Sequence, residues 1–209
     1  MKLYDFALAP SPRRVRMYLA EKGIEVPTQQ VNLREGEHLA EAYLKINPRA
    51  TVPVLELDDG TVLCEFPAIC RYFEEQNPEP PLMGTDAKDK AVVTMWDRFM
   101  EYDGFMAVAE ALRNSAPRLE NRALTGPVNV AQIPELAERG RERVKRFMKD
   151  LDTRLGDNKF VAGERFTVAD ITAFVAIEFA GVVKMEVPDD HANLKRWHAS
   201  VAARPSAKA

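Results

Sequence analysis

The 209-residue sequence lacks several features that would place it in other classes of protein. No apolar run approaches the roughly 18–20 residues that a membrane-spanning helix needs. The first ten residues have no apolar core of the kind found in signal peptides, so we expect a cytoplasmic protein. Lysine and arginine (29) do not outnumber the acidic residues (32), and the net charge of −3 predicts no surface for binding nucleic acid.

Cysteine and histidine are scarce, with two and three residues respectively. Cys64 and Cys70 do not form the C-x-x-C pair of dithiol enzymes, so we expect reduced, structural thiols. His191 and His198 have no partner at metal-ligand spacing, and the sequence therefore predicts no metal site.

The stretch that is most informative about function, Ile46–Ile69, combines a proline turn, a hairpin and the start of a helix. Pro53 comes directly before the alternating residues 54–57, which is a position where an X-Pro bond can be cis. Asp59-Gly60 tolerates the positive φ of a tight turn, so residues 62–64 should return antiparallel to the first strand.

Glu65-Phe66-Pro67 follows this hairpin and should open a helix, with Pro67 at its first position and Phe66 as a poor cap. A carboxylate beside the unpaired N–H groups of a helix start can hold a zwitterion, because the acid binds an ammonium and the amides bind a carboxylate. From the poor cap we expect Phe66→Ser to increase stability.

Residues 1–77 have the order strand, helix, strand, helix, hairpin, helix, which predicts a small α/β sandwich. We expect Ser11 to cap the first helix with Pro12 at its first position, and Gly23 to end that helix. The Ser11 hydroxyl could serve as a cap or point at a ligand. Arg13, Arg14 and Arg16 are predicted to form a solvated face.

A proline-rich linker at 78–84 separates this region from residues 85–209, in which nearly all periodicity is helical. Residues 117–134 form a loop without periodicity. Thr167 and Asp170 form a capping box before the apolar run 171–183, which should be the core helix of this part. Residues 203–209 resemble a frayed end.

Together these segments resemble the cytosolic glutathione S-transferase superfamily over essentially the whole chain. The resemblance is carried by PSPRRVRMYLAEKG, GEHLAEAYLKINP, TVPVLELDDGTVL and FVAGERFTVADI. The GEH and FAGVVKMEVP segments are most similar to the subgroup that contains yeast's second glutathione transferase, and also to theta-like bacterial members. The resemblance implies an N-terminal thioredoxin-like α/β domain and an all-helical C-terminal domain, glutathione as co-substrate, and a homodimer.

The resemblance also implies roles for individual residues. Pro53 should be cis, with the Val52 backbone binding the cysteinyl part of glutathione. Glu65 should bind the γ-glutamyl ammonium, and His38 should hold the glycyl carboxylate. The family usually has serine or threonine after this acid, to bind the γ-glutamyl carboxylate, where this chain has Phe66, so Phe66→Ser should also increase glutathione affinity. The family's catalytic hydroxyl or thiol commonly falls at position 9, which is alanine here, so Ser11 is the nearest candidate. The full set of expected glutathione contacts is Ser11, Arg13, His38, Val52, Pro53, Glu65 and Phe66.

The expected reaction is attack of the glutathione thiolate on a small hydrophobic electrophile. Ser11, the dipole of the first helix and Arg13 would lower the pKa of the thiol. The electrophile should bind between the domains, against Phe6, Leu8, Tyr102, Phe105 and Arg113. Two alternatives remain open: glutathione-dependent reduction of disulfides or peroxides, and a non-catalytic module that binds glutathione or a hydrophobic ligand.

Overall fold

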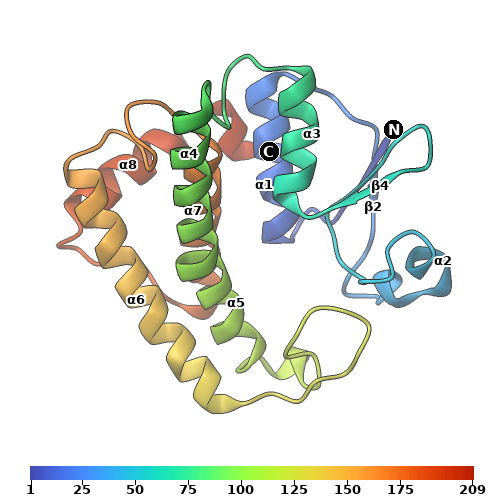
Figure 1. The fold of residues 1–209 in the computed structure, drawn as a ribbon. Coiled ribbons are helices and arrows are strands. Elements are labelled where there is room, and N and C mark those ends of the chain that lie inside the picture. Colours follow the sequence, from blue (N-terminus) through green and yellow to red (C-terminus); the bar gives the residue numbers. More distant parts are fainter.

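A computed structural model describes residues 1–209. The N-terminal part contains a four-stranded sheet in the order β2-β1-β3-β4, in which β1 and β2 are parallel and the other pairs are antiparallel (Figure 1). Its elements are β1 (Lys2–Asp5), α1 (Pro10–Lys22), β2 (Thr28–Gln30), η1 (Glu37–Leu39), α2 (Glu41–Leu44), β3 (Val54–Glu56), β4 (Val62–Cys64) and α3 (Phe66–Gln76).

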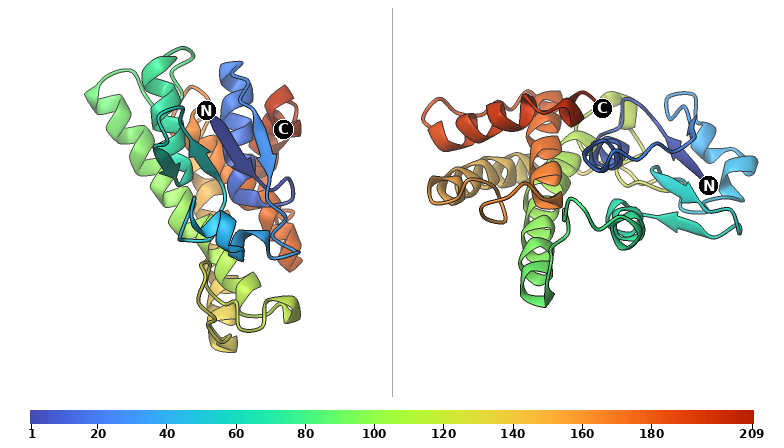
Figure 2. Two further views of the ribbon diagram at one scale, coloured as in Figure 1. Left: turned by 90° about the vertical axis from the view of Figure 1, so that its right-hand side faces the viewer. Right: turned by 90° about the horizontal axis from the view of Figure 1, so that it is seen from above.

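The predicted hairpin is confirmed, because β3 and β4 pair antiparallel around a turn in which Gly60 has φ of 84°. Leu3 and Leu55 lie opposite each other in the sheet and are both buried. Helices α1 and α3 lie between the sheet and the helical part, and α2 lies on the opposite side of the sheet (Figures 1 and 2). This arrangement confirms the thioredoxin-like domain.

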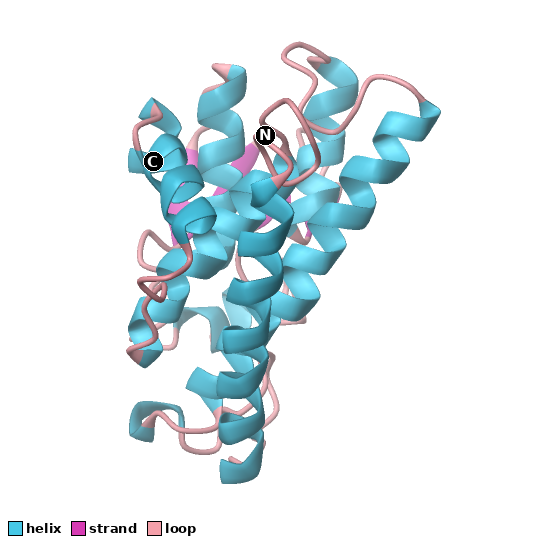
Figure 3. Ribbon diagram, turned by 90° about the vertical axis from the view of Figure 1, so that its left-hand side faces the viewer, coloured by secondary structure: helices cyan, strands magenta, loops and turns pink.

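The C-terminal part is entirely helical apart from its loops (Figure 3). Its helices are α4 (Ala87–Phe99), the π-helical segment η2 (Met100–Phe105), α5 (Met106–Arg113), η3 (Pro117–Leu119), α6 (Pro134–Gly156), α7 (Val168–Ala180), η4 (Gly181–Val183), α8 (Ala192–Ala202) and η5 (Pro205–Lys208). Helices α4, η2 and α5 follow one another without a break. No helix combines the length and the apolar composition needed to cross a membrane.

Helix α7 is the centre of the helical part, as the sequence predicts. Thr167 and Asp170 form the predicted capping box, and Asp170 also accepts hydrogen bonds from the Val161 amide and the Trp197 indole at 2.9 Å. One hydrophobic cluster runs from β1, α1 and α3 through α7 to η5. The two parts of the chain therefore share a core.

Three local predictions are wrong. Helix α1 begins at Pro10 with Ala9 as its N-cap, so Ser11 lies inside the first turn and makes no capping bond. Helix α3 begins at Phe66 itself, with Glu65 as N-cap. The C-terminal residues are not frayed, because they form η5 and Ser206 is buried against α1, where its hydroxyl donates to Glu21.

Candidate active site

The first turn of α1 carries one hydroxyl, that of Ser11. Ser11 is half-buried, and its Oγ accepts a hydrogen bond of 3.0 Å from Nη2 of Arg14. These two residues are three apart on the helix and so lie on the same face. Both α1 and α3 begin on the side of the sheet that faces the loop between α5 and α6 (Figure 1).

Arg14 is buried, with 2 % of its side chain exposed. Its guanidinium carbon lies 4.5 Å from the ring centre of Phe66 and 4.2 Å from that of Phe105, and Nη1 donates to Glu101 at 3.2 Å. Burial lowers the pKa of Arg14 to about 10, so the group is still a cation at neutral pH. The prediction that Arg14 belongs to a solvated face is therefore wrong.

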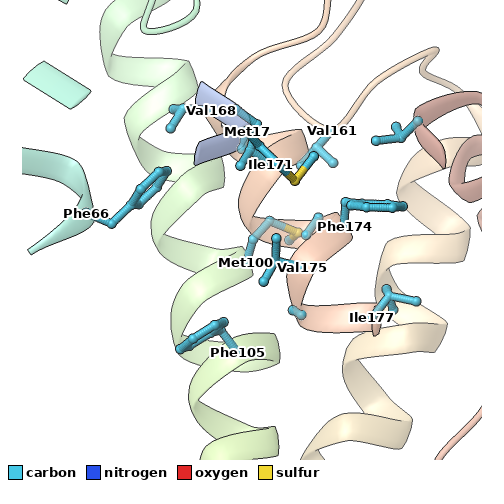
Figure 4. Close-up of a cluster of buried hydrophobic side chains, with 14 of the residues drawn as sticks. Met17, Phe66, Met100, Phe105, Val161, Val168, Ile171, Phe174, Val175 and Ile177 are labelled. Carbon is cyan, nitrogen blue, oxygen red and sulfur yellow. The ribbon is translucent and has the colours of Figure 1, made fainter. Parts of the chain in front are cut away.

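Phe66 and Phe105 come from different parts of the chain. Figure 4 shows Phe66 extending from the start of α3 toward the helix formed by α4 and η2, on which Phe105 lies. Both rings are buried, and Phe105 also packs 5.5 Å from Phe179. Phe105 also belongs to the hydrophobic cluster that the two parts share.

The turn before β3 presents unpaired backbone groups. The Val52–Pro53 bond is cis, as the resemblance implies, and the Val52 amide and carbonyl enter no hydrogen bond within the chain. An extended peptide can therefore pair with Val52 as an added strand.

Glu65 connects β4 to α3 in a strained conformation. Its φ of 75° lies in the left-handed region, which costs about 1–3 kcal/mol for a residue other than glycine. The residue is exposed, and the Phe66 amide that follows it makes no backbone hydrogen bond. A carboxylate and a free helix-start amide therefore lie side by side, as a zwitterion site requires.

His38 lies in η1 beside a cluster of cations from the helical part, Arg113 and Arg122. Burial, followed by the nearby Arg122 and Arg113, holds the pKa of His38 below its usual value. His38 Nδ1 and Arg113 Nε are both buried and have no hydrogen-bond partner. The loop that carries Arg122 also approaches the N-terminal part at Gly126, where an added Cβ would lie 3.7 Å from the Arg49 carbonyl. This cationic cluster could bind an anion.

The other residues predicted to contact glutathione or the electrophile are spread over several surroundings. Arg13 donates to the Ala207 carbonyl at 3.0 Å, and its guanidinium carbon lies 5.5 Å from the Phe174 ring centre. It therefore contacts the C-terminal segment, whereas Ser11 is contacted by Arg14. Leu8 and Tyr102 expose 64 % and 58 % of their surface, and Arg113 is partly buried at the end of α5. Phe6 is half-buried and packs on the small cluster around Tyr4.

Neither cysteine is suited to act as a nucleophile. Burial raises the pKa of the Cys70 thiol well above its usual value, and it raises the pKa of the half-buried Cys64 thiol as well. Both residues therefore stay protonated at neutral pH, and any reactive thiolate must come from a ligand.

Arg14 and Glu101 are the site residues that the sequence analysis missed. The spacing of Ser11 and Arg14 on one helix face was a usable signal. The burial of Arg14 was not, because arginine is almost never buried unless it is paired, and its partners come from α3 and η2.

The fold has clear counterparts among known proteins. Residues 9–76 match the glutathione S-transferase N-terminal domain, and residues 96–205 match the glutathione S-transferase C-terminal domain. The chain therefore belongs to the glutathione S-transferase family, and the resemblance inferred from the sequence is confirmed.

Individual relatives match along the full length. Glutathione S-transferase 2 of Saccharomyces cerevisiae is 36% identical over 211 residues, covering 100% of this chain and 88% of the yeast protein. Its crystal structure superposes with a TM-score of 0.91 and covers 100% and 99% of the two chains. A glutathione S-transferase domain-containing protein of Marinobacter aquaeolei is 39% identical, with a TM-score of 0.91 and 99% coverage of both chains.

Proposed function

We propose that the protein transfers glutathione to a small hydrophobic electrophile by attack of the glutathione thiolate. The observation that carries this proposal is the meeting of a hydroxyl, a helix start and a buried cation at Ser11. A free thiol with a pKa near 8.5 is only a few per cent ionised at neutral pH, and a hydroxyl donor and a helix start each favour its ionised form.

Glutathione in this proposal lies across the starts of α1 and α3. Its γ-glutamyl ammonium pairs with Glu65 and its γ-glutamyl carboxylate accepts from the Phe66 amide. The cysteinyl backbone pairs with Val52 beside Pro53, which brings the thiol toward Ser11. The support for this pose is the unpaired state of the Val52 and Phe66 amides.

At its other end, the glycyl carboxylate contacts His38. The support is the unpartnered His38 Nδ1 and the adjacent Arg113 and Arg122, which give the cluster excess positive charge. The electrophile would then lie between the start of α1 and the η2 segment, near the exposed side chains of Leu8 and Tyr102, with Phe6 and Phe105 behind them. Arg13 acts at a distance in this arrangement, through its charge alone.

Conjugation of glutathione to a model aryl halide tests the function. Ser11→Ala should raise the pH midpoint of the rate by about one unit, because one donor to the thiolate is lost. An unchanged midpoint would remove Ser11 from the mechanism. Reduction of a glutathione mixed disulfide faster than conjugation would indicate a reductase, and retention on immobilised glutathione without turnover would indicate a binding module.

The assembly and location expected from the resemblance are proposals as well. We propose a cytoplasmic homodimer. Sedimentation velocity at several protein concentrations would test the dimer, and fractionation of the source cells would test the location.

A further inference from the structure

The hydrogen bonding of Ser11 has a specific direction. A hydroxyl donates one hydrogen and accepts through two lone pairs, whereas a guanidinium only donates. The 3.0 Å contact from Arg14 therefore occupies a lone pair of Ser11 and leaves the hydroxyl hydrogen free. Ser11 makes no other side-chain hydrogen bond, and it makes no capping bond at the start of α1.

Arg14 itself is held by two aromatic rings and two acceptors. The ring centres of Phe66 and Phe105 lie 4.5 and 4.2 Å from its guanidinium carbon, and Glu101 accepts from Nη1 while Ser11 accepts from Nη2. The planar fork of arginine can span two acceptors in this way, and a lysine ammonium on a flexible stem does not reproduce that geometry. The guanidinium is therefore fixed relative to the start of α1.

We propose that Arg14 is a positioning residue for the proposed transfer reaction: by donating to Ser11 Oγ it directs the hydroxyl hydrogen toward the glutathione thiolate and strengthens that hydrogen bond. A hydroxyl that accepts a charge-assisted bond becomes a better donor, because chains of hydrogen bonds polarise one another. No proton is transferred to Arg14 or from it. Ser11 keeps its hydrogen throughout and stabilises the sulfur anion that attacks the electrophile.

This role also gives a reason for Phe66. The resemblance leads one to expect a hydroxyl residue after Glu65, yet this chain places a buried aromatic ring there, against the guanidinium. Phe66 contributes its backbone amide to the ligand and its ring to Arg14. One residue thus links the γ-glutamyl end of the site to the thiol end.

The inference rests on the proposed function, and its test is the pKa of the thiol of bound glutathione, read from the ultraviolet absorbance of the thiolate. Arg14→Met should raise that pKa by about one unit, which lowers the conjugation rate about tenfold below the midpoint. In a Ser11→Ala background, Arg14→Met should add no further shift. Arg14→Lys, which keeps the charge without the fork, should also raise the pKa.

A matched control is Arg204→Met, because Arg204 also packs on an aromatic ring, 4.0 Å from the centre of Phe166, and pairs with a glutamate, Glu21. It should lower stability and leave the thiol pKa unchanged. A full shift on top of Ser11→Ala, or an unshifted pKa in Arg14→Lys, would show that Arg14 acts through its charge alone and overturn the inference. If wild-type protein neither binds nor conjugates glutathione, the proposed function itself fails.

Discussion

His38 is the residue at which pH should act most directly on ligand binding. Its pKa lies below the usual value because the imidazole is partly buried and faces Arg122 and Arg113. In the proposed complex, a ligand carboxylate at this cluster would supply negative charge and raise that pKa. Binding would then be accompanied by uptake of a proton in the pH range between the free and bound values of the His38 pKa.

We expect the affinity for S-methylglutathione to increase as pH falls through the bound-state pKa of His38 and to level off below the free-state pKa. The methylated ligand is chosen because it has no titrating thiol. His38→Gln should weaken binding and flatten this dependence, which calorimetric titration across about pH 5 to 8 would measure. An identical pH profile in the variant would place the carboxylate elsewhere.

At the scale of the element, the start of α3 combines stability with function. Phe66 is the first residue of the helix, its side chain has no measurable exposure, and its ring centre lies 4.5 Å from the guanidinium carbon of Arg14. The strained Glu65 precedes it as N-cap. Because the side chain is in the core, a serine at this position could not cap the helix and would leave a cavity.

Phe66→Ser should lower the free energy of unfolding by about 3–5 kcal/mol, the range for removal of a buried aromatic ring. The sequence analysis expected this substitution to increase stability, and the structure predicts the opposite. Phe99→Ser is a suitable control, because Phe99 is 44% exposed on α4 and its loss should cost about 1 kcal/mol or less. Urea unfolding would measure both, and a Phe66→Ser protein as stable as the wild type would show that the ring does not support the core.

The elements that could be predicted are those defined by interactions between residues close together in the sequence. The β3–β4 hairpin and the capping box at Thr167 depend on neighbours in the sequence, and both are confirmed. The burial of Arg14 could not be predicted, because its partners Phe105 and Glu101 lie in the other part of the chain. The proposed glutathione contacts Val52, Pro53 and Glu65 could be named from their motifs. The contact of Arg14 with Ser11 could not be predicted in the same way.

At the scale of the whole molecule, the C-terminal segment fastens the helical part to α1. Arg204 donates two hydrogen bonds to Glu21, at 2.7 and 2.6 Å, and Arg13 donates to the Ala207 carbonyl. The C-terminus lies beside α1 in Figure 1. Burial alone would raise the pKa of Glu21, but hydrogen bonds from Arg204 and Ser206 outweigh it and hold the pKa below its usual value.

A lowered carboxyl pKa stabilises the folded state above the unfolded value of 4.5, and this stabilisation is lost as pH falls through the folded value. Glu21→Gln should therefore lower the free energy of unfolding at neutral pH by about 2 kcal/mol, the scale of hydrogen bonds to a charged group. The difference from wild type should shrink in acid. Thermal unfolding at several pH values tests this, and a difference that is constant with pH would exclude an ionised Glu21 as its source.

The central claim is that the start of α1 holds the glutathione sulfur through Ser11, with Arg14 behind it. A crystal structure with glutathione bound tests this most directly. The account predicts a sulfur within hydrogen-bonding distance of Ser11 Oγ, with Arg14 still donating to the same oxygen and Phe66 N–H donating to the γ-glutamyl carboxylate. A sulfur held by another group, or a Ser11 hydroxyl turned away from it, would contradict the account.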